Sequence, residues 1–89
     1  MAKRDRLEII KDILSIIQSN QNSIKITPLI RKSNLSSSNF YEYHSELLKK
    51  NFIKETAHSN NKFISLTDKG LKFLEKYRTI INFIDEFEL

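Results

Sequence analysis

Cysteine is absent from this 89-residue sequence, and glycine and proline occur only once each. Without thiols the chain can form neither disulfides nor thiolate metal sites. A single glycine excludes the glycine-rich loops that bind phosphate groups. No apolar run approaches the ~20 residues of a membrane span, and charged residues interrupt any apolar region near the N-terminus that a signal peptide would need. We therefore expect a cytoplasmic protein without a membrane partner.

Catalytic and metal-binding patterns are also missing. The two histidines, His44 and His58, have neither cysteine nor a carboxylate at metal-ligand spacing, so no zinc site is predicted. The serines at 36–38 lack a base oriented by an acid, and a helix cap explains them better than a nucleophile. We expect no enzyme activity, no metal, no cofactor and no small-molecule ligand.

The composition is that of an ordinary globular protein, with 39% hydrophobic and 29% charged residues. The length predicts a single domain over residues 1–89. Lys and Arg outnumber Asp and Glu by fifteen to eleven, and three of the acids are Asp85, Glu86 and Glu88. Residues 1–84 thus hold fifteen basic against eight acidic residues, a net charge of +7. This balance suits an anionic partner, although charge alone does not single out nucleic acid.

The first helix is predicted over residues 4–19, because apolar residues recur there at spacings of three and four. Seven of the eleven residues from 7 to 17 are apolar, so this helix should be covered on more than one side at the centre of the core. A turn at 20–23 and a short strand at 24–26 should follow. The apolar stripe consists of Leu7, Ile9, Ile10, Ile13, Leu14, Ile16 and Ile17.

Two short helices separated by a tight turn are predicted over residues 27–50, a helix-turn-helix. Thr27 can cap the first helix, with Pro28 at the first helical position. Asn34 can end that helix in the left-handed conformation, and Ser36 can cap the second. Because glycine is so scarce, asparagine should take this role wherever a helix stops, namely at Asn20, Asn34 and Asn51.

The second of these helices should have one buried and one exposed face. Phe40, Tyr43, His44 and Leu47 recur at spacings of three and four and are expected to point inward. The outward face could enter a DNA groove; it consists of Ser38, Tyr41, Glu42, Ser45 and Lys49.

A β-hairpin is predicted over residues 52–66, where the apolar period changes to two. The strands should be 52–56 and 62–66, with a polar loop over 57–61. A hairpin directly behind a helix-turn-helix is called a wing. Its tip carries His58, Asn60, Asn61 and Lys62, which could contact phosphate or could form a solvated turn.

The last helix is predicted over residues 67–88, with Thr67 as its cap. Leu71 and Leu74 can return to the core, whereas the later apolar residues follow a heptad spacing that suits a second copy of the chain. Lysines crowd the first half and acids the end, so an antiparallel pair would bring opposite charges together. The alternative is that this face folds back onto the first helix. The predicted dimer interface is Tyr77, Ile80, Ile81, Ile84 and Phe87.

Several stretches resemble a family of small archaeal winged-helix DNA-binding proteins, over roughly residues 3–80. The resemblance rests on the Arg4-Asp5-Arg6-Leu7-Glu8-Ile9-Ile10 opening, Ile13-Leu14, Asn34-Leu35-Ser36, Tyr43, Leu47 and Leu66-Thr67-Asp68-Lys69-Gly70. The resemblance implies a mainly α winged helix-turn-helix fold, in the order α-β-α-α-β-β-α, with a long C-terminal helix. It also implies dimerisation through an antiparallel C-terminal coiled coil and binding to duplex DNA, as a transcriptional regulator or a nucleoid-associated protein.

The residues by themselves support the same function. Small and hydrogen-bonding side chains on the outward helix face can reach base edges, and cations around it can bind phosphate. Because serine and tyrosine read bases weakly, phosphate contacts should dominate the affinity. One alternative is a protein-contact module using Tyr41, Glu42, Phe63 and the C-terminal acids, and another is a bare dimerisation module. The predicted DNA-binding residues are Arg31, Lys32, Ser37, Ser38, Tyr41, Ser45, Lys49, Asn60, Asn61 and Lys62.

Overall fold

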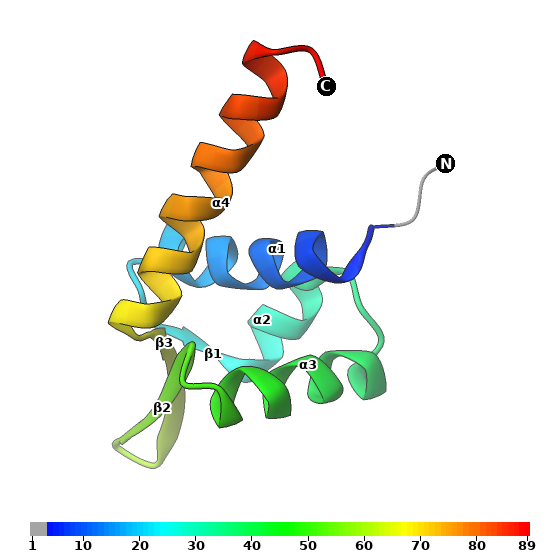
Figure 1. Cartoon of the computed structure of the whole chain (residues 1–89). Coiled ribbons are helices and arrows are strands. Elements are labelled where there is room, and N and C mark those ends of the chain that lie inside the picture. The colour runs from blue at the N-terminus through cyan, green and yellow to red at the C-terminus, as the bar shows by residue number, and fades with distance from the viewer. Residues whose placement is uncertain (1–3) are drawn as a thin grey trace.

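The computed structural model describes residues 4–89, in which four helices pack together with a small three-stranded sheet at one edge of the molecule (Figure 1). The order of elements confirms the predicted mainly helical fold with a hairpin and a long last helix. In chain order the elements are α1 (Arg6–Ser19), β1 (Ile24–Lys25), α2 (Ile26–Ser33), α3 (Ser37–Lys49), β2 (Ile53–His58), β3 (Asn61–Leu66) and α4 (Asp68–Glu86).

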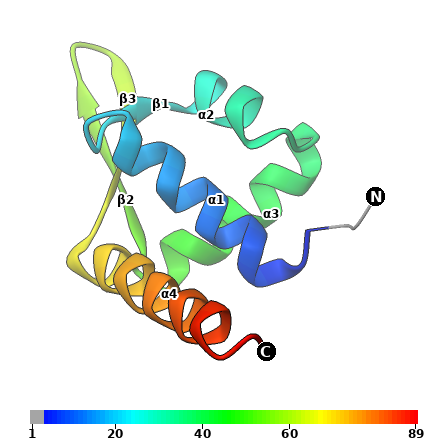
Figure 2. The same ribbon diagram turned by 90° about the horizontal axis from the view of Figure 1, so that it is seen from above.

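Helix α1 crosses the centre of the molecule, with α3 on one side and α4 on the other (Figures 1 and 2). Most of its apolar stripe is buried, as the sequence predicts, since Leu14 and Ile17 are fully inaccessible. Leu7 is an exception, because it is 56% exposed. In this first turn of α1 the contact with α3 is made by Arg6, through Glu46 and the Tyr43 ring. The core is completed by Ile10, Ile13, Ile24, Leu29, Phe40, Leu47, Ile53, Ile64, Leu66 and Leu74.

Helix α1 begins at Arg6, two residues later than the predicted start at residue 4. Asp5 is the N-cap, and its carboxylate accepts a hydrogen bond from the Glu8 amide at 2.8 Å. Asp is among the favoured N-cap residues, so the helix starts immediately behind it.

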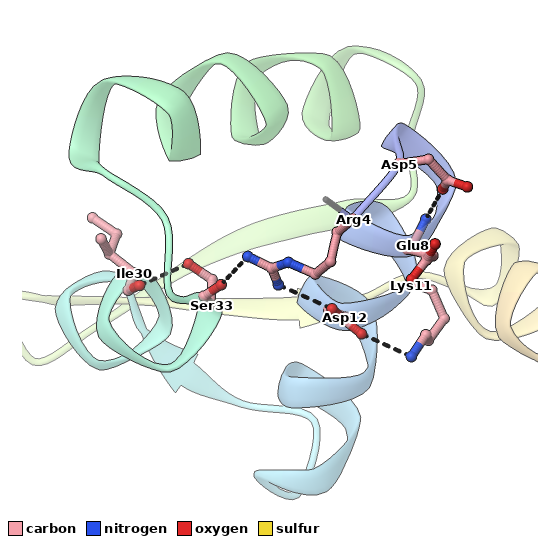
Figure 3. Close-up of polar contacts among 7 residues, drawn as sticks. All are labelled: Arg4, Asp5, Glu8, Lys11, Asp12, Ile30 and Ser33. Atoms are coloured by element: carbon pink, nitrogen blue, oxygen red, sulfur yellow. Dashed lines mark hydrogen bonds and ion pairs between the residues drawn. The ribbon is translucent and has the colours of Figure 1, made fainter. Parts of the chain in front are cut away.

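Arg4, which precedes the cap, fastens the start of α1 to the end of α2 (Figure 3). Its guanidinium donates to the Asp12 carboxylate at 2.9 Å and to the Ser33 carbonyl, at the end of α2, at 3.0 Å. Burial raises the pKa of Asp12, but hydrogen bonds from Lys11 and Arg4 outweigh burial and hold that pKa below its ordinary value.

Helix α2 begins one residue before the predicted Thr27 cap. Lys25 occupies the N-cap position without a side-chain hydrogen bond, and Thr27 and Pro28 lie within the first turn. The prediction for Thr27 is wrong because the chain passes directly from the β1 pairing with β3 into the helix. Pro28 is still tolerated there, since the first amides of a helix have no partner within it.

The turn of the helix-turn-helix has the predicted chemistry. Asn34 ends α2 in the left-handed region, with φ 59° and ψ 34°. Ser36 caps α3, and its hydroxyl accepts a hydrogen bond from the Asn39 amide at 3.3 Å. Both predictions are confirmed, and together they fix the angle at which α3 leaves α2.

The prediction that asparagine takes the left-handed conformation wherever a helix stops is confirmed only in part at the other helix ends. Asn51 behind α3 has φ 63°, as expected. Asn20 behind α1 has φ −94° instead, and the left-handed residues are Gln21 and Asn22, at 61° and 57°. The chain turns after α1 one residue later than the sequence pattern suggests.

The sheet has the order β1-β3-β2 and is antiparallel throughout. Both wing strands are longer than predicted, because pairing continues to His58 and Asn61. Only Ser59 and Asn60 remain in the turn, with φ 50° and 67°. Two central residues with positive φ match the tight hairpin turn that suits the twist of antiparallel strands. The predicted loop over 57–61 is therefore too long.

Helix α4 starts where predicted and then leaves the body of the protein. Thr67 accepts a hydrogen bond from the Gly70 amide at 3.2 Å, and Leu74 is 1% exposed. Beyond Tyr77 the helix projects away from the side that carries α3 and the wing (Figure 1). With 19 residues, it is about 28 Å long at 1.5 Å per residue.

Candidate nucleic-acid interface

One side of α3 is turned away from the core, and it carries half of the residues predicted to bind DNA. Phe40, His44 and Leu47 are buried on the opposite side. This confirms the expected division of the helix into two faces. The structure brings together on the exposed face Ser37, Ser38, Tyr41, Ser45 and Lys49.

Tyr41 is the largest side chain on this face and is 47% exposed. Its ring meets those of Phe40 and His44 edge to face, with centroid distances of 5.7 and 5.9 Å. Both contacts come from its own helix. They restrain the ring, which reduces the entropy cost of ordering it against a ligand.

Two of the cations predicted to bind phosphate are exposed and are not engaged with acidic side chains of the described residues. Within residues 4–89, neither Arg31 on α2 nor Lys49 at the end of α3 forms an ion pair, and both are exposed. Lys32 differs, because its Nζ lies 3.4 Å from Oδ1 of Asn20. It is therefore directed to the turn behind α1.

Of the two acids on α3, one is neutralised by neighbours. Glu46 forms ion pairs with Arg6 of α1 and with Lys50, the latter at 3.2 Å. Glu42 is exposed and forms no ion pair within residues 4–89. The negative charge of α3 is therefore partly offset, at Glu46.

The wing lies beside the C-terminal half of α3, and its tip is solvent-exposed. Asn60 is in the turn, whereas Asn61 and Lys62 belong to β3. Lys62 pairs with Ala57. Because side chains alternate along a strand, Lys62 lies on the same face as buried Ile64, the face that packs toward the helices. Lys62, one of the wing residues predicted to bind DNA, therefore lies on the sheet face that also carries core residues.

A contact between α3 and the wing was not predicted. His44 of α3 is 8% exposed, and its Nε2 lies 3.4 Å from a carboxylate oxygen of Glu55 on β2. Burial lowers the pKa of His44, and the negative charge of Glu55 partly offsets this. Helical spacing in the sequence places His44 on the inner flank of α3. It does not show how β2 is aligned against that helix, so Glu55 could not be identified as the neighbour.

The second predicted surface is the distal half of α4. Ile80 and Phe87 are exposed by 58% and 57%, so the alternative in which this face folds back onto α1 is wrong for them. Ile81 lies on the side facing α1 and lines a hollow with Lys11 and Tyr77. Phe83, which the prediction omitted, is 54% exposed and lies 4.9 Å from the Phe87 ring, centroid to centroid. Their spacing of four residues was the available signal.

Two kinds of site are not found in the part of the chain that the structure describes. No three His, Cys, Asp or Glu side chains among residues 4–89 come together in a way that could hold a metal ion. In the same residues, no helix combines the length and the apolar character needed to cross a membrane.

The sequence matches the family described as "Winged helix-turn-helix" over residues 3–85, and the chain belongs to this family. No match was found among curated proteins.

Similar solved structures come from an archaeon and from viruses. Sso10a-2, a DNA-binding protein from Sulfolobus solfataricus, has a TM-score of 0.75 and 20% identity, over 96% of this chain and 86% of the other. A winged-helix DNA-binding protein from STIV has a TM-score of 0.74 and 20% identity, covering 89% and 91%. SSV1 F-93 has a TM-score of 0.72 and 25% identity, covering 99% and 95%. These likenesses establish a shared fold.

Proposed function

We propose that this protein binds double-stranded DNA, with α3 in the major groove and Lys and Arg side chains on the phosphates. It acts without catalysis, as a transcriptional regulator or a nucleoid-associated protein of the cytoplasm. The observation that carries the proposal is the exposed face of α3, where small and hydrogen-bonding side chains are flanked by unpaired cations. Sso10a-2 and the STIV protein, which share this fold, are DNA-binding proteins, and this supports the proposal.

The chemistry of this face indicates how the DNA would be read. Ser38 and Ser45 are short enough to let the helix approach base edges, and Tyr41 supplies a hydroxyl and an apolar ring. None of them makes the bidentate contacts by which Arg or Asn selects a base. We expect Arg31 and Lys49 to provide most of the affinity through phosphate contacts, with modest sequence preference.

The proposal includes a homodimer formed through the distal half of α4. Its interface would consist of Tyr77, Ile80, Ile84 and Phe87, extended by Phe83, with Ile81 on the side nearer α1. An apolar helix face of this length is seldom left in water. The lysines at the start of α4 and the acids at its end favour an antiparallel pair.

One observation favours a second candidate, a winged helix that binds another protein. Glu42 is an exposed acid of α3 that forms no ion pair within residues 4–89, and there it would repel phosphate. A protein partner with a basic residue could use both Glu42 and Tyr41. This candidate predicts an interface with weak dependence on salt.

The two candidates are separated by titrating a fluorescent random-sequence duplex of about 30 base pairs at several salt concentrations. For the DNA-binding candidate, the logarithm of the affinity falls linearly with the logarithm of the salt concentration, with a slope of several units. Arg31→Ala and Lys49→Ala should each weaken binding and reduce the slope by about one unit.

Lys72→Ala provides the matched control. It removes the same charge from an exposed position on α4, on the side of the molecule away from the outer face of α3. Its salt slope should equal that of the unaltered protein. If Lys72→Ala weakens binding as much as Lys49→Ala, the attraction is due to net charge rather than to the α3 face. If no duplex binds even at low salt, the proposed function is wrong.

A further inference from the structure

The buried histidine beneath the exposed face of α3 connects the two parts of the candidate interface. His44 supports the ring of Tyr41 edge to face at 5.9 Å and stacks on Phe40 at 5.7 Å, with an interplanar angle of 28°. Its Nε2 faces Glu55 on the wing strand β2. One imidazole thus touches both a proposed DNA-reading side chain and the wing.

The Nε2 atom of His44 is buried and forms no hydrogen bond within residues 4–89. The 3.4 Å separation from Glu55 is an approach without hydrogen-bond geometry. A buried polar atom without a partner costs free energy. Protonation would convert Nε2 into a charged donor beside a carboxylate, the pair that gives the stronger class of hydrogen bond.

The charges around the imidazole come from few elements. Tyr41 is the titratable neighbour on α3, and Glu55 is the charged neighbour on β2. On β3, Lys62 lies on the same sheet face as Glu55, two residue pairs nearer the tip. From α1, Arg6 is engaged with Glu46, and from α2, Arg31 is exposed. Among these, Glu55 is the charge that acts on His44.

We propose that His44 is a pH-sensitive positioning residue, whose protonation fastens the wing to α3 beneath Tyr41 and strengthens duplex binding as the solution is acidified. The inference rests on the proposed DNA binding and adds a form of regulation to the same site. Imidazole is the side chain suited to this, because its charge changes near physiological pH.

The sign follows from the two environments of the ring. In the free protein, burial holds the pKa of His44 below its ordinary value, so the ring is neutral near pH 7. Phosphates brought against α3 add negative potential, which favours the imidazolium and raises this pKa. A bound complex that takes up a proton becomes tighter as pH falls. Affinity should therefore increase by about threefold or more as pH falls from neutral through the pKa of the bound protein.

Folding should show the opposite dependence. Because the pKa of His44 is lower in the folded chain than in the unfolded one, the unfolded chain binds more protons below about pH 6.5. The stability that His44 contributes is therefore complete above that pH and is lost as pH falls through the folded-state pKa. As pH falls, duplex affinity should rise while the free energy of unfolding of the free protein falls. The opposite signs separate the effect of pH on binding from its effect on folding.

The test measures duplex affinity between about pH 5.5 and 8 at constant ionic strength, for the unaltered protein, His44→Gln and His58→Gln. The glutamine at 44 keeps a polar amide but does not titrate. His58 lies on the exposed wing, so His58→Gln is the matched control for the only other histidine. We expect His44→Gln to remove the pH dependence and His58→Gln to retain most of it.

Imidazole NMR of the unaltered protein, with and without duplex, provides a measurement that does not depend on a variant folding. The pKa of His44 should rise when duplex is added, and Glu55→Gln should lower it in both the free and the bound protein, because the Glu55 charge favours the imidazolium in each. An unchanged His44 pKa, or a pH dependence that survives His44→Gln, overturns the inference while DNA binding stands. Absence of duplex binding at every pH overturns the proposed function and this inference with it.

Discussion

The two halves of α4 have different surroundings although they belong to one continuous helix. In the first half, Leu74 is 1% exposed and Gly70 is buried. In the second half, Ile80, Phe83 and Phe87 are all more than half exposed. The first half is held by the fold of its own chain, whereas the second half offers an apolar face that nothing in residues 4–89 covers.

This difference shows that apolar periodicity marks a surface to be buried but not what buries it. The same spacing of three and four residues places Leu71 and Leu74 against the core and Ile80, Ile84 and Phe87 outside it. Gly70 shows how closely the first half is held, since a Cβ atom there would lie 2.3 Å from the Phe52 carbonyl oxygen. The predictions below separate burial within the chain from burial by a second copy.

The largest expected effect is the loss of core packing in the first half. Leu74→Ala should lower the free energy of unfolding by about 2–5 kcal/mol, because it deletes a fully buried side chain. Urea unfolding at several protein concentrations measures this, and the loss should be the same at each. Ile80→Ala is the matched variant in the second half. Its cost should appear only at concentrations where the dimer is populated. Equal costs at all concentrations would mean that Ile80 is buried within one chain.

Removal of the proposed dimer should come next in size. Ile80→Glu combined with Ile84→Glu places four carboxylates in a twofold interface, so dissociation should become at least tenfold easier, a change of about 1.4 kcal/mol. Light scattering measures the mass, and circular dichroism checks that the helices remain. Thr79→Glu with Asn82→Glu adds the same charge on other sides of α4 and should leave the dimer intact. A double variant at 80 and 84 that stays dimeric, or an unaltered protein that is always monomeric, would contradict the proposed interface.

The smallest expected effect compares two threonines on the same helix. Thr67 caps α4 and also donates its hydroxyl to the Asn51 carbonyl, so Thr67→Ala should cost about 1 kcal/mol. Thr79 bonds the Glu75 carbonyl within the helix at 3.0 Å, and Ala is the better helix former. Thr79→Ala should therefore change stability by less than about 0.5 kcal/mol. Thermal unfolding of both variants measures the difference, and similar losses would show that capping does not anchor α4.

Much of the fold could be predicted because local chemistry and packing agree. Asn34 and Ser36 end one helix and start the next through their own side chains, so the turn between α2 and α3 is readable from the sequence. The prediction at Thr27 failed because strand pairing of Lys25, a tertiary contact, set the start of α2 instead. The expected burial of Leu7 was wrong as well, and in that turn of α1 the tertiary contact with α3 is made by Arg6.

The residues on the exposed face of the candidate interface could be predicted, but the contacts that its residues make with other elements could not. The outward face of α3 follows from helical spacing alone, and the structure places Ser38, Tyr41 and Lys49 there. Three contacts were not predicted: Glu46 with Arg6, His44 with Glu55, and Phe83 with Phe87, whose spacing of four residues was a signal in the sequence. The first two join different elements, and their residues are at least eleven positions apart in the sequence.

The left-handed residues also have a consequence for the unfolded chain. Among the described residues 4–89, seven other than glycine have positive φ, including Asn34 and Asn51 at the ends of helices and Asn60 in the wing. Glycine at such positions would relieve local strain, but it would give the unfolded chain more conformations to lose on folding. By turning with asparagine, this chain reaches the same backbone shape from a smaller unfolded ensemble. Part of its stability therefore comes from the lower conformational entropy of the unfolded chain, and this part does not correspond to any contact in the folded protein.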